Sequence, residues 1–217
     1  MAPRAPSRPR WRARCITVAA LAIALTGCFT GDRPTLADRP ETTGDGATDA
    51  VLALLDQSRA ATFTAGYDVL TRFGGLQTPA TVVQASPDRR SVTVGDVRFI
   101  FDGSSTATCL LDTAACSDTI DAGQISDTQL APDFYGSSAA ARLRRDVAAR
   151  LDATTASTEV IAGETATCVA IPLPNSSSTY CALDSGVLAR LDAADVVIGL
   201  TSYAAAPDES QFARSAS

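Results

Sequence analysis

The chain has 217 residues, 18 basic and 24 acidic side chains, and a formal net charge of −6 at pH 7. An acidic protein is repelled by phosphate backbones, so we expect no nucleic acid partner. The sequence contains no histidine and no lysine. This excludes Ser-His-Asp and Cys-His catalysis, lysine Schiff bases and imidazole metal sites within one chain. We therefore expect no enzyme, no catalytic residue, no cofactor and no metal.

The first 27 residues are typical of a lipoprotein signal peptide. The segment "MAPRAPSRPRWRAR" is rich in arginine and free of acids, and an apolar run of roughly 12 residues follows it. That run is too short for a membrane-spanning helix, which needs about 20 residues. It ends in "LTGC" (25–28), which resembles the lipobox of bacterial lipoproteins. By that resemblance Cys28 becomes the first mature residue and carries diacylglycerol, a palmitate-type anchor, on its sulfur.

Cleavage before Cys28 makes the mature chain more acidic. It keeps all 24 acids but only 13 of the 18 arginines, which gives a net charge of about −11. Residues 28–49 are rich in Pro, Gly, Thr and Asp and cannot bury enough surface to offset chain entropy, so they predict a flexible tether. The polar residues 206–217 predict a disordered tail. A single domain over 50–205 remains, on the extracytoplasmic face of the cell membrane.

The first half of that domain predicts one helix followed by a meander. Residues 48–60 place apolar side chains at helical spacing, and 62–73 alternate apolar with polar residues as a half-buried strand does. Short apolar runs then follow, separated by Ser-Pro-Asp, Gly-Asp and Asp-Gly-Ser-Ser turns. Strands joined so closely make an antiparallel meander. The predicted strands are 80–86, 90–94, 96–103 and 106–112.

The second half predicts a helical insertion and more strands. Residues 125–155 include an apolar stripe beside several arginines, and the helix is interrupted near Pro132 and Gly136. Apolar strands resume after it. The fold class is therefore α+β, a curved antiparallel sheet with an N-terminal helix and a helical insertion covering one face. The predicted later strands are 157–173, 178–184, 186–192 and 195–205.

Four cysteines remain in the mature domain besides Cys28. An even number in an exported chain predicts disulfide bonds. Local pairing fits best of the three connectivities: Cys109 with Cys116 closes a short ring, and Cys168 with Cys181 closes a hairpin. Crossed pairing and free thiols remain alternatives. A zinc site would need two Cys-x-x-Cys knuckles, and these spacings do not match.

The element order, with "FTAGYDVLTRFGG" (63–75), "VRFIFDGSSTATC" (97–109) and the second cysteine hairpin, resembles the LolA-like lipoproteins of the bacterial envelope, of LppX and LprG type. The resemblance implies a half-barrel with helices on its concave side and an apolar cavity that holds acyl chains. The candidate lining residues are Leu52, Leu55, Phe63, Tyr67, Val69, Phe99, Phe101, Leu143, Val147 and Val160.

Two functions follow as hypotheses. If the candidate residues line a cavity, the protein is a membrane-anchored module that binds or shuttles lipid. If they fill the space themselves, it is a structural or accessory lipoprotein that presents a protein-binding face to an envelope partner. The sequence alone leaves both open, because a set of small and aliphatic core residues is compatible with either.

Overall fold

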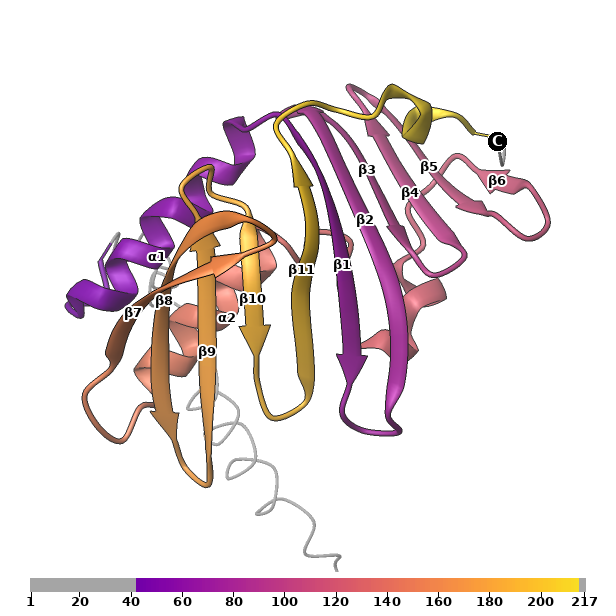
Figure 1. Ribbon diagram of the computed structural model, residues 1–217. Coiled ribbons are helices and arrows are strands. Elements are labelled where there is room, and N and C mark those ends of the chain that lie inside the picture. Colours follow the sequence, from indigo (N-terminus) through magenta and orange to yellow (C-terminus); the bar gives the residue numbers. More distant parts are fainter. Residues whose placement is uncertain (1–41, 215–217) are drawn as a thin grey trace, which may run out of the picture. The chain divides into compact units, whose positions relative to one another are not determined.

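The computed structural model describes residues 42–214, so the predicted signal peptide, Cys28 and most of the predicted tether lie outside the described residues. The described chain forms one antiparallel sheet of 11 strands with helices packed against it (Figure 1). The α+β half-barrel predicted from the sequence is confirmed. Within this part of the chain no helix is long and apolar enough to cross a bilayer.

The strands form two meanders that meet in the middle of the sheet. The order is β6-β5-β4-β3-β2-β1-β11-β10-β9-β8-β7, so the first and last strands of the chain pair with each other. The N-terminal meander comprises β1 (Phe63–Thr71), β2 (Leu76–Ser86), β3 (Arg89–Val94), β4 (Val97–Asp102), β5 (Ser105–Leu110) and β6 (Ala115–Ser117). The C-terminal meander comprises β7 (Thr155–Ile161), β8 (Glu164–Leu173), β9 (Ser176–Leu183), β10 (Leu188–Asp192) and β11 (Val196–Ala204).

Two α-helices cover the C-terminal meander. Helix α1 (Gly46–Gln57) begins at the N-cap Asp45, whose side chain accepts a hydrogen bond from the Thr48 amide at 2.8 Å. Helix α2 (Ser137–Ala148) is the regular part of the predicted insertion. Both helices pack on each other and on β8, and α1 also packs on β9, behind the sheet in Figure 1. Their apolar faces complete the main core.

A glycine lets the sheet approach α1 closely. Gly186 lies in the turn between β9 and β10 with φ of +85°, a conformation that side chains rarely adopt. A Cβ atom there would lie 2.4 Å from the Leu54 carbonyl oxygen and 2.6 Å from the Ser58 amide nitrogen. Only glycine fits between this turn and the last turn of α1.

Within residues 42–214, three short 3₁₀ helices complete the fold: η1 (Ser58–Ala60), η2 (Ala122–Thr128) and η3 (Glu209–Phe212). The last of these corrects the prediction of a disordered tail over 206–217. The described part of that segment packs against β3, and Phe212 contacts a small cluster made by Ile100, Ala107 and Cys109 on the face opposite the main core. Phe212 and polar contacts such as the ion pair of Arg89 with Glu209 hold this segment on the sheet.

Other predicted boundaries also need correction. Helix α1 begins two residues before 48, inside the predicted tether. The predicted strand 157–173 is two strands, β7 and β8, joined by a tight turn at Ala162 and Gly163, both with positive φ. Alanine is uncommon at positive φ, so Gly163 is the one turn signal in this two-residue turn. Strand β6 was not predicted.

Candidate functional site

The predicted cavity lining forms the centre of the core. Eight of the ten residues are buried in one hydrophobic cluster, and Phe101 is half-buried beside it. Val160 was wrong: it is 75% exposed, because β7 is the edge strand of the sheet and most of its side chains face solvent. The eight buried residues are Leu52, Leu55, Phe63, Tyr67, Val69, Phe99, Leu143 and Val147.

Two aromatic side chains from the segment between η2 and α2 occupy the space beneath β1. The rings of Phe134 and Tyr67 meet edge to face with centroids 5.2 Å apart, and those of Tyr135 and Phe63 do so at 5.9 Å. The rings of Phe134 and Tyr135 also meet edge to face, with centroids 5.8 Å apart. All four side chains are at least 96% buried. At this position the core is filled by aromatic packing, in the arrangement that aromatic pairs prefer.

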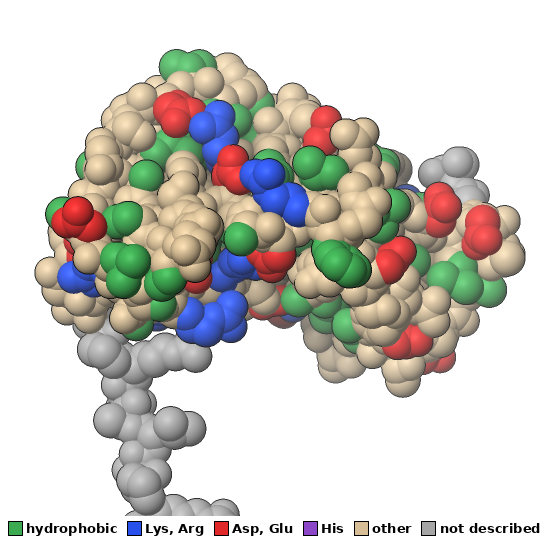
Figure 2. Space-filling model, turned by 90° about the horizontal axis from the view of Figure 1, so that it is seen from below, with side chains coloured by type: hydrophobic (Ala, Val, Ile, Leu, Met, Phe, Trp, Pro, Cys, Tyr) green, Lys and Arg blue, Asp and Glu red, His purple; other side chains and the backbone are tan. Residues whose placement is uncertain are grey.

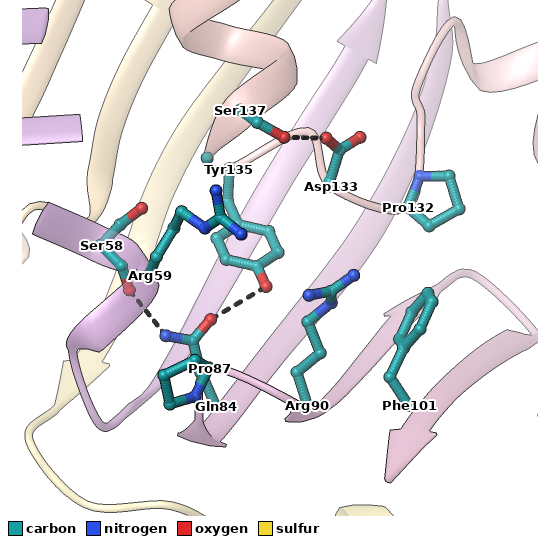
Figure 3. Close-up of a pocket in the computed structure, with 11 residues that line it drawn as sticks. Ser58, Arg59, Gln84, Pro87, Arg90, Phe101, Pro132, Asp133, Tyr135 and Ser137 are labelled. Atoms are coloured by element: carbon teal, nitrogen blue, oxygen red, sulfur yellow. Dashed lines mark hydrogen bonds between the residues drawn. The ribbon is translucent and has the colours of Figure 1, made fainter. Parts of the chain in front are cut away.

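A groove opens beside this aromatic cluster (Figure 3). Its volume is about 370 Å³. The end of α1, the turn between β2 and β3, strand β4 and the start of α2 all contribute to it. It is thus assembled from four segments that are distant in sequence. The lining residues are Ser58, Arg59, Gln84, Pro87, Arg90, Phe101, Pro132, Asp133, Tyr135, Gly136 and Ser137.

The floor of the groove is held by Gln84, a buried polar residue of β2. Its Nε2 donates to the carbonyl oxygens of Ser58 at 2.6 Å and Ala61 at 2.7 Å. Its Oε1 accepts a hydrogen bond from the Tyr135 hydroxyl at 3.3 Å (Figure 3). Burial raises the pKa of Tyr135 to about 12, so the hydroxyl stays protonated and remains a donor at neutral pH. This network fixes the end of α1 and the aromatic cluster to the same strand.

Two arginines provide the positive charge of the groove. Arg59 follows α1, and Arg90 lies on β3 with its guanidinium carbon 4.1 Å from the centroid of the Phe101 ring. Neither forms an ion pair with any residue in the described range 42–214, and the Nε of Arg90 is buried there without a hydrogen-bond partner. Figure 3 shows both guanidinium groups projecting into the open space.

The groove also contains one carboxylate, which is already partnered. Asp133 accepts hydrogen bonds from the hydroxyl groups of Ser137 and Ser138 in the first turn of α2. Its oxygens are therefore turned toward the helix start, as the dashed line to Ser137 in Figure 3 shows. The groove thus combines two arginines that form no ion pair among the described residues, one hydrogen-bonded carboxylate, two aromatic rings and two prolines, a composition that suits a binding surface.

The disulfides have the predicted local connectivity. Cys109 bonds to Cys116 and Cys168 bonds to Cys181, with Cα atoms 4.1 and 4.0 Å apart. Each pair lies directly opposite on neighbouring antiparallel strands, where Cα atoms come closest. Glu159 lies near the second pair, but these sulfurs are bonded to each other and are not thiolate ligands. The Glu159 carboxylate instead forms an ion pair with Arg190, with an N–O distance of 2.6 Å.

Comparison with known proteins shows the fold. The chain is similar to a chain of the Pseudomonas aeruginosa MucA/MucB complex, with a TM-score of 0.50 and 16% identity over 77% of this chain and 60% of that one. MucB alone gives 0.48 at 15% identity, covering 78% and 63%. The Mycobacterium tuberculosis lipoprotein LppX gives 0.37 at 19% identity, covering 71% and 93%. The described domain has a LolA-like fold.

The similarity to these solved structures covers only part of their chains and shows the fold alone. The chain spans about 60% of the length of the protein that it matches in the MucA/MucB complex. No family model matches the sequence. No curated protein matches it either.

The groove residues Arg59, Gln84, Arg90 and Tyr135 were not predicted as site residues, because they lie at the ends of separate elements and form no motif. The one signal available was a run of two arginines, Arg89 and Arg90, at the start of a predicted strand.

Proposed function

We propose that the protein is an extracytoplasmic lipoprotein, anchored through Cys28, whose folded domain binds a protein partner in the cell envelope. The observation that carries this proposal is the aromatic cluster of Phe134 and Tyr135, which packs against Phe63 and Tyr67 and fills the space beneath β1 with side chains. The fold is shared with MucB, which has been solved in complex with MucA. The proposal includes no catalytic activity.

The location outside the cytoplasm is supported by the two disulfide bonds, since such bonds persist in oxidising compartments. The sequence "LTGC" (25–28), which resembles a lipobox, supports the proposed anchor at Cys28. We expect Cys28→Ser to move the protein from the membrane fraction into soluble fractions. Retention of this variant in the membrane to the wild-type extent would contradict lipid anchoring.

The partner class is tested by two measurements on the mature protein. Native mass spectrometry after extraction in mild detergent should show the mass of the polypeptide with its anchor and no further lipid. Crosslinking in intact cells should trap one abundant envelope protein. A co-purified acyl ligand in stoichiometric amount would contradict the proposal and favour the lipid-binding alternative, which the same fold and anchor would serve. An empty crosslinking result would contradict it independently.

A further inference from the structure

We propose that the groove between Arg59 and Arg90 binds an acidic side chain, Asp or Glu, presented by a surface segment of the partner protein. This inference rests on the proposed function and names the chemistry of the contact. The volume of about 370 Å³ is sufficient for a few side chains and lies at the lower end of the range for ligand pockets, about 300 to 1,000 Å³.

Charge complementarity is the first argument. Six of the eleven arginines in the described range form ion pairs with carboxylates, and on the face shown in Figure 2 arginine and acidic side chains lie among one another. Acids greatly outnumber arginines in the mature chain. Even so, Arg59 and Arg90 lie together in a groove without an acidic partner among the described residues. An anion from outside the domain would complete this arrangement.

The geometry of Arg90 favours a planar anion. Its guanidinium carbon lies over the Phe101 ring, 4.1 Å from the centroid, a cation–π contact that holds the group beside the groove. Arg90 forms no ion pair among residues 42–214, and an arginine fork pairs with a carboxylate through two parallel hydrogen bonds.

Asp133 favours a carboxylate over a phosphate monoester. It lines the same groove, and a phosphate monoester would bring nearly two negative charges close to this carboxylate. A carboxylate brings only one, so its repulsion from Asp133 is smaller.

The remaining lining fits a protein segment. Arginine, tyrosine and phenylalanine are enriched in the centres of protein interfaces, and Arg59, Arg90, Phe101 and Tyr135 supply these residue types here. The floor is rigid, because Gln84 ties the end of α1 to Tyr135. A rigid surface loses little entropy on binding, which raises affinity for a given set of contacts.

The experiment is a selection of short random peptides, displayed on phage, against the immobilised mature protein. Selected peptides should be enriched in Asp or Glu at one position. Arg59→Gln and Arg90→Gln should each weaken binding of a selected peptide about ten-fold or more, the loss typical of a hydrogen-bonded ionic contact. Arg90→Lys should restore part of the affinity, since it keeps the charge but not the fork.

Arg145→Gln is the matched control. It removes the same charge from an exposed position on α2 outside the groove, and should leave peptide binding unchanged. Urea unfolding of each variant checks that the domain remains folded. Peptides without acidic residues, peptides that bind the Arg59→Gln, Arg90→Gln double variant as well as wild type, or failure to select any binder would each overturn the inference.

A competition experiment with lipid vesicles distinguishes an acidic side chain from a lipid headgroup as the ligand of the groove. Phosphatidylglycerol vesicles should not compete with a selected peptide. Competition that depends on Arg59 and Arg90 would assign the groove to a lipid headgroup and overturn the inference. If cells still yield the same crosslinked partner with the double variant, the proposed function stands while the groove is excluded as the contact. If the crosslink is lost in the double variant but not in Arg145→Gln, the result supports both the proposed function and the groove as the contact.

Discussion

The two meanders share one topology but are covered in different ways. Two regular helices lie on the C-terminal meander and present continuous apolar faces to β8 and β9. Beneath the N-terminal meander the cover is an irregular segment with two aromatic residues, and the groove remains open at its edge. On the opposite face, η3 covers part of this same meander. A regular helix closes a surface, whereas an irregular segment fills it locally and leaves room for a ligand.

The largest effect should come from removing the aromatic cover of the N-terminal meander. We expect Phe134→Ala to lower the free energy of unfolding by about 3 to 5 kcal/mol, since it empties a buried aromatic site. Phe73→Ala is the control, because that ring is 89% exposed, and should change it by less than about 0.5 kcal/mol. Urea unfolding measures both. A loss below about 1 kcal/mol for Phe134→Ala would show that this space is not tightly filled.

Removing the disulfide of the C-terminal meander should lower the free energy of unfolding more than removing the disulfide of the N-terminal meander. Replacing Cys168 and Cys181 with alanine should cost about 3 kcal/mol, and replacing Cys109 and Cys116 about 2.5 kcal/mol, because the first pair closes the longer loop. Burial should widen this difference in stability. Cys168 and Cys181 are fully buried, whereas Cys116 lies exposed on the short strand β6. Denaturant midpoints of the two double variants test the ranking, which a larger loss at the β5–β6 pair would reverse.

The contact between α2 and the C-terminal meander should contribute less. The Tyr180 hydroxyl donates to Asp146 at 2.6 Å, and burial together with this carboxylate raises the pKa of Tyr180. Tyr180→Phe should cost about 1.5 kcal/mol, as expected for a hydrogen bond to a charged group. Tyr203→Phe removes a hydroxyl that makes no hydrogen bond among the described residues and should be neutral. Equal losses in the two variants would refute the role of the Asp146 contact.

The smallest effect concerns pH. Hydrogen bonds from Arg142 lower the pKa of Asp195, so this pair stabilises the folded state above the unfolded carboxyl pKa of about 3.9 and loses its contribution as the pH falls through the lower, folded value. Asp195→Asn should cost about 0.5 kcal/mol at pH 7, given the partial exposure of the pair. The difference from wild type should shrink in strong acid. A constant difference from pH 7 to pH 2 would contradict this assignment.

Sequence periodicity predicted the regular elements because each pattern is local. The alternation in 62–73 and the two cysteine pairs depend on near neighbours, and both predictions were confirmed in outline. The alternation was extended too far at its end: β1 stops at Thr71, and Phe73 projects into solvent. A hairpin tip leaves such a residue without a facing strand.

The aromatic cover and the groove could not be predicted in the same way. Phe134 and Tyr135 lie between Pro132 and Gly136, where the chain has no period from which burial could be inferred. Arg59 and Arg90 become neighbours only because Gln84 fixes the end of α1 against β2. Such a site depends on tertiary contacts between four segments, and a single sequence contains no local signal for them.

The pairing of β1 with β11 also has a consequence for the order of folding. Strand β11 is among the last parts of the domain to be synthesised, yet it occupies the centre of the sheet and joins both meanders. Until it emerges, the inner edges of β1 and β10 are unpaired, and contacts so distant in sequence form slowly. An open edge is a template for pairing with another chain. The nascent domain is therefore most prone to aggregation immediately before its final strand is added.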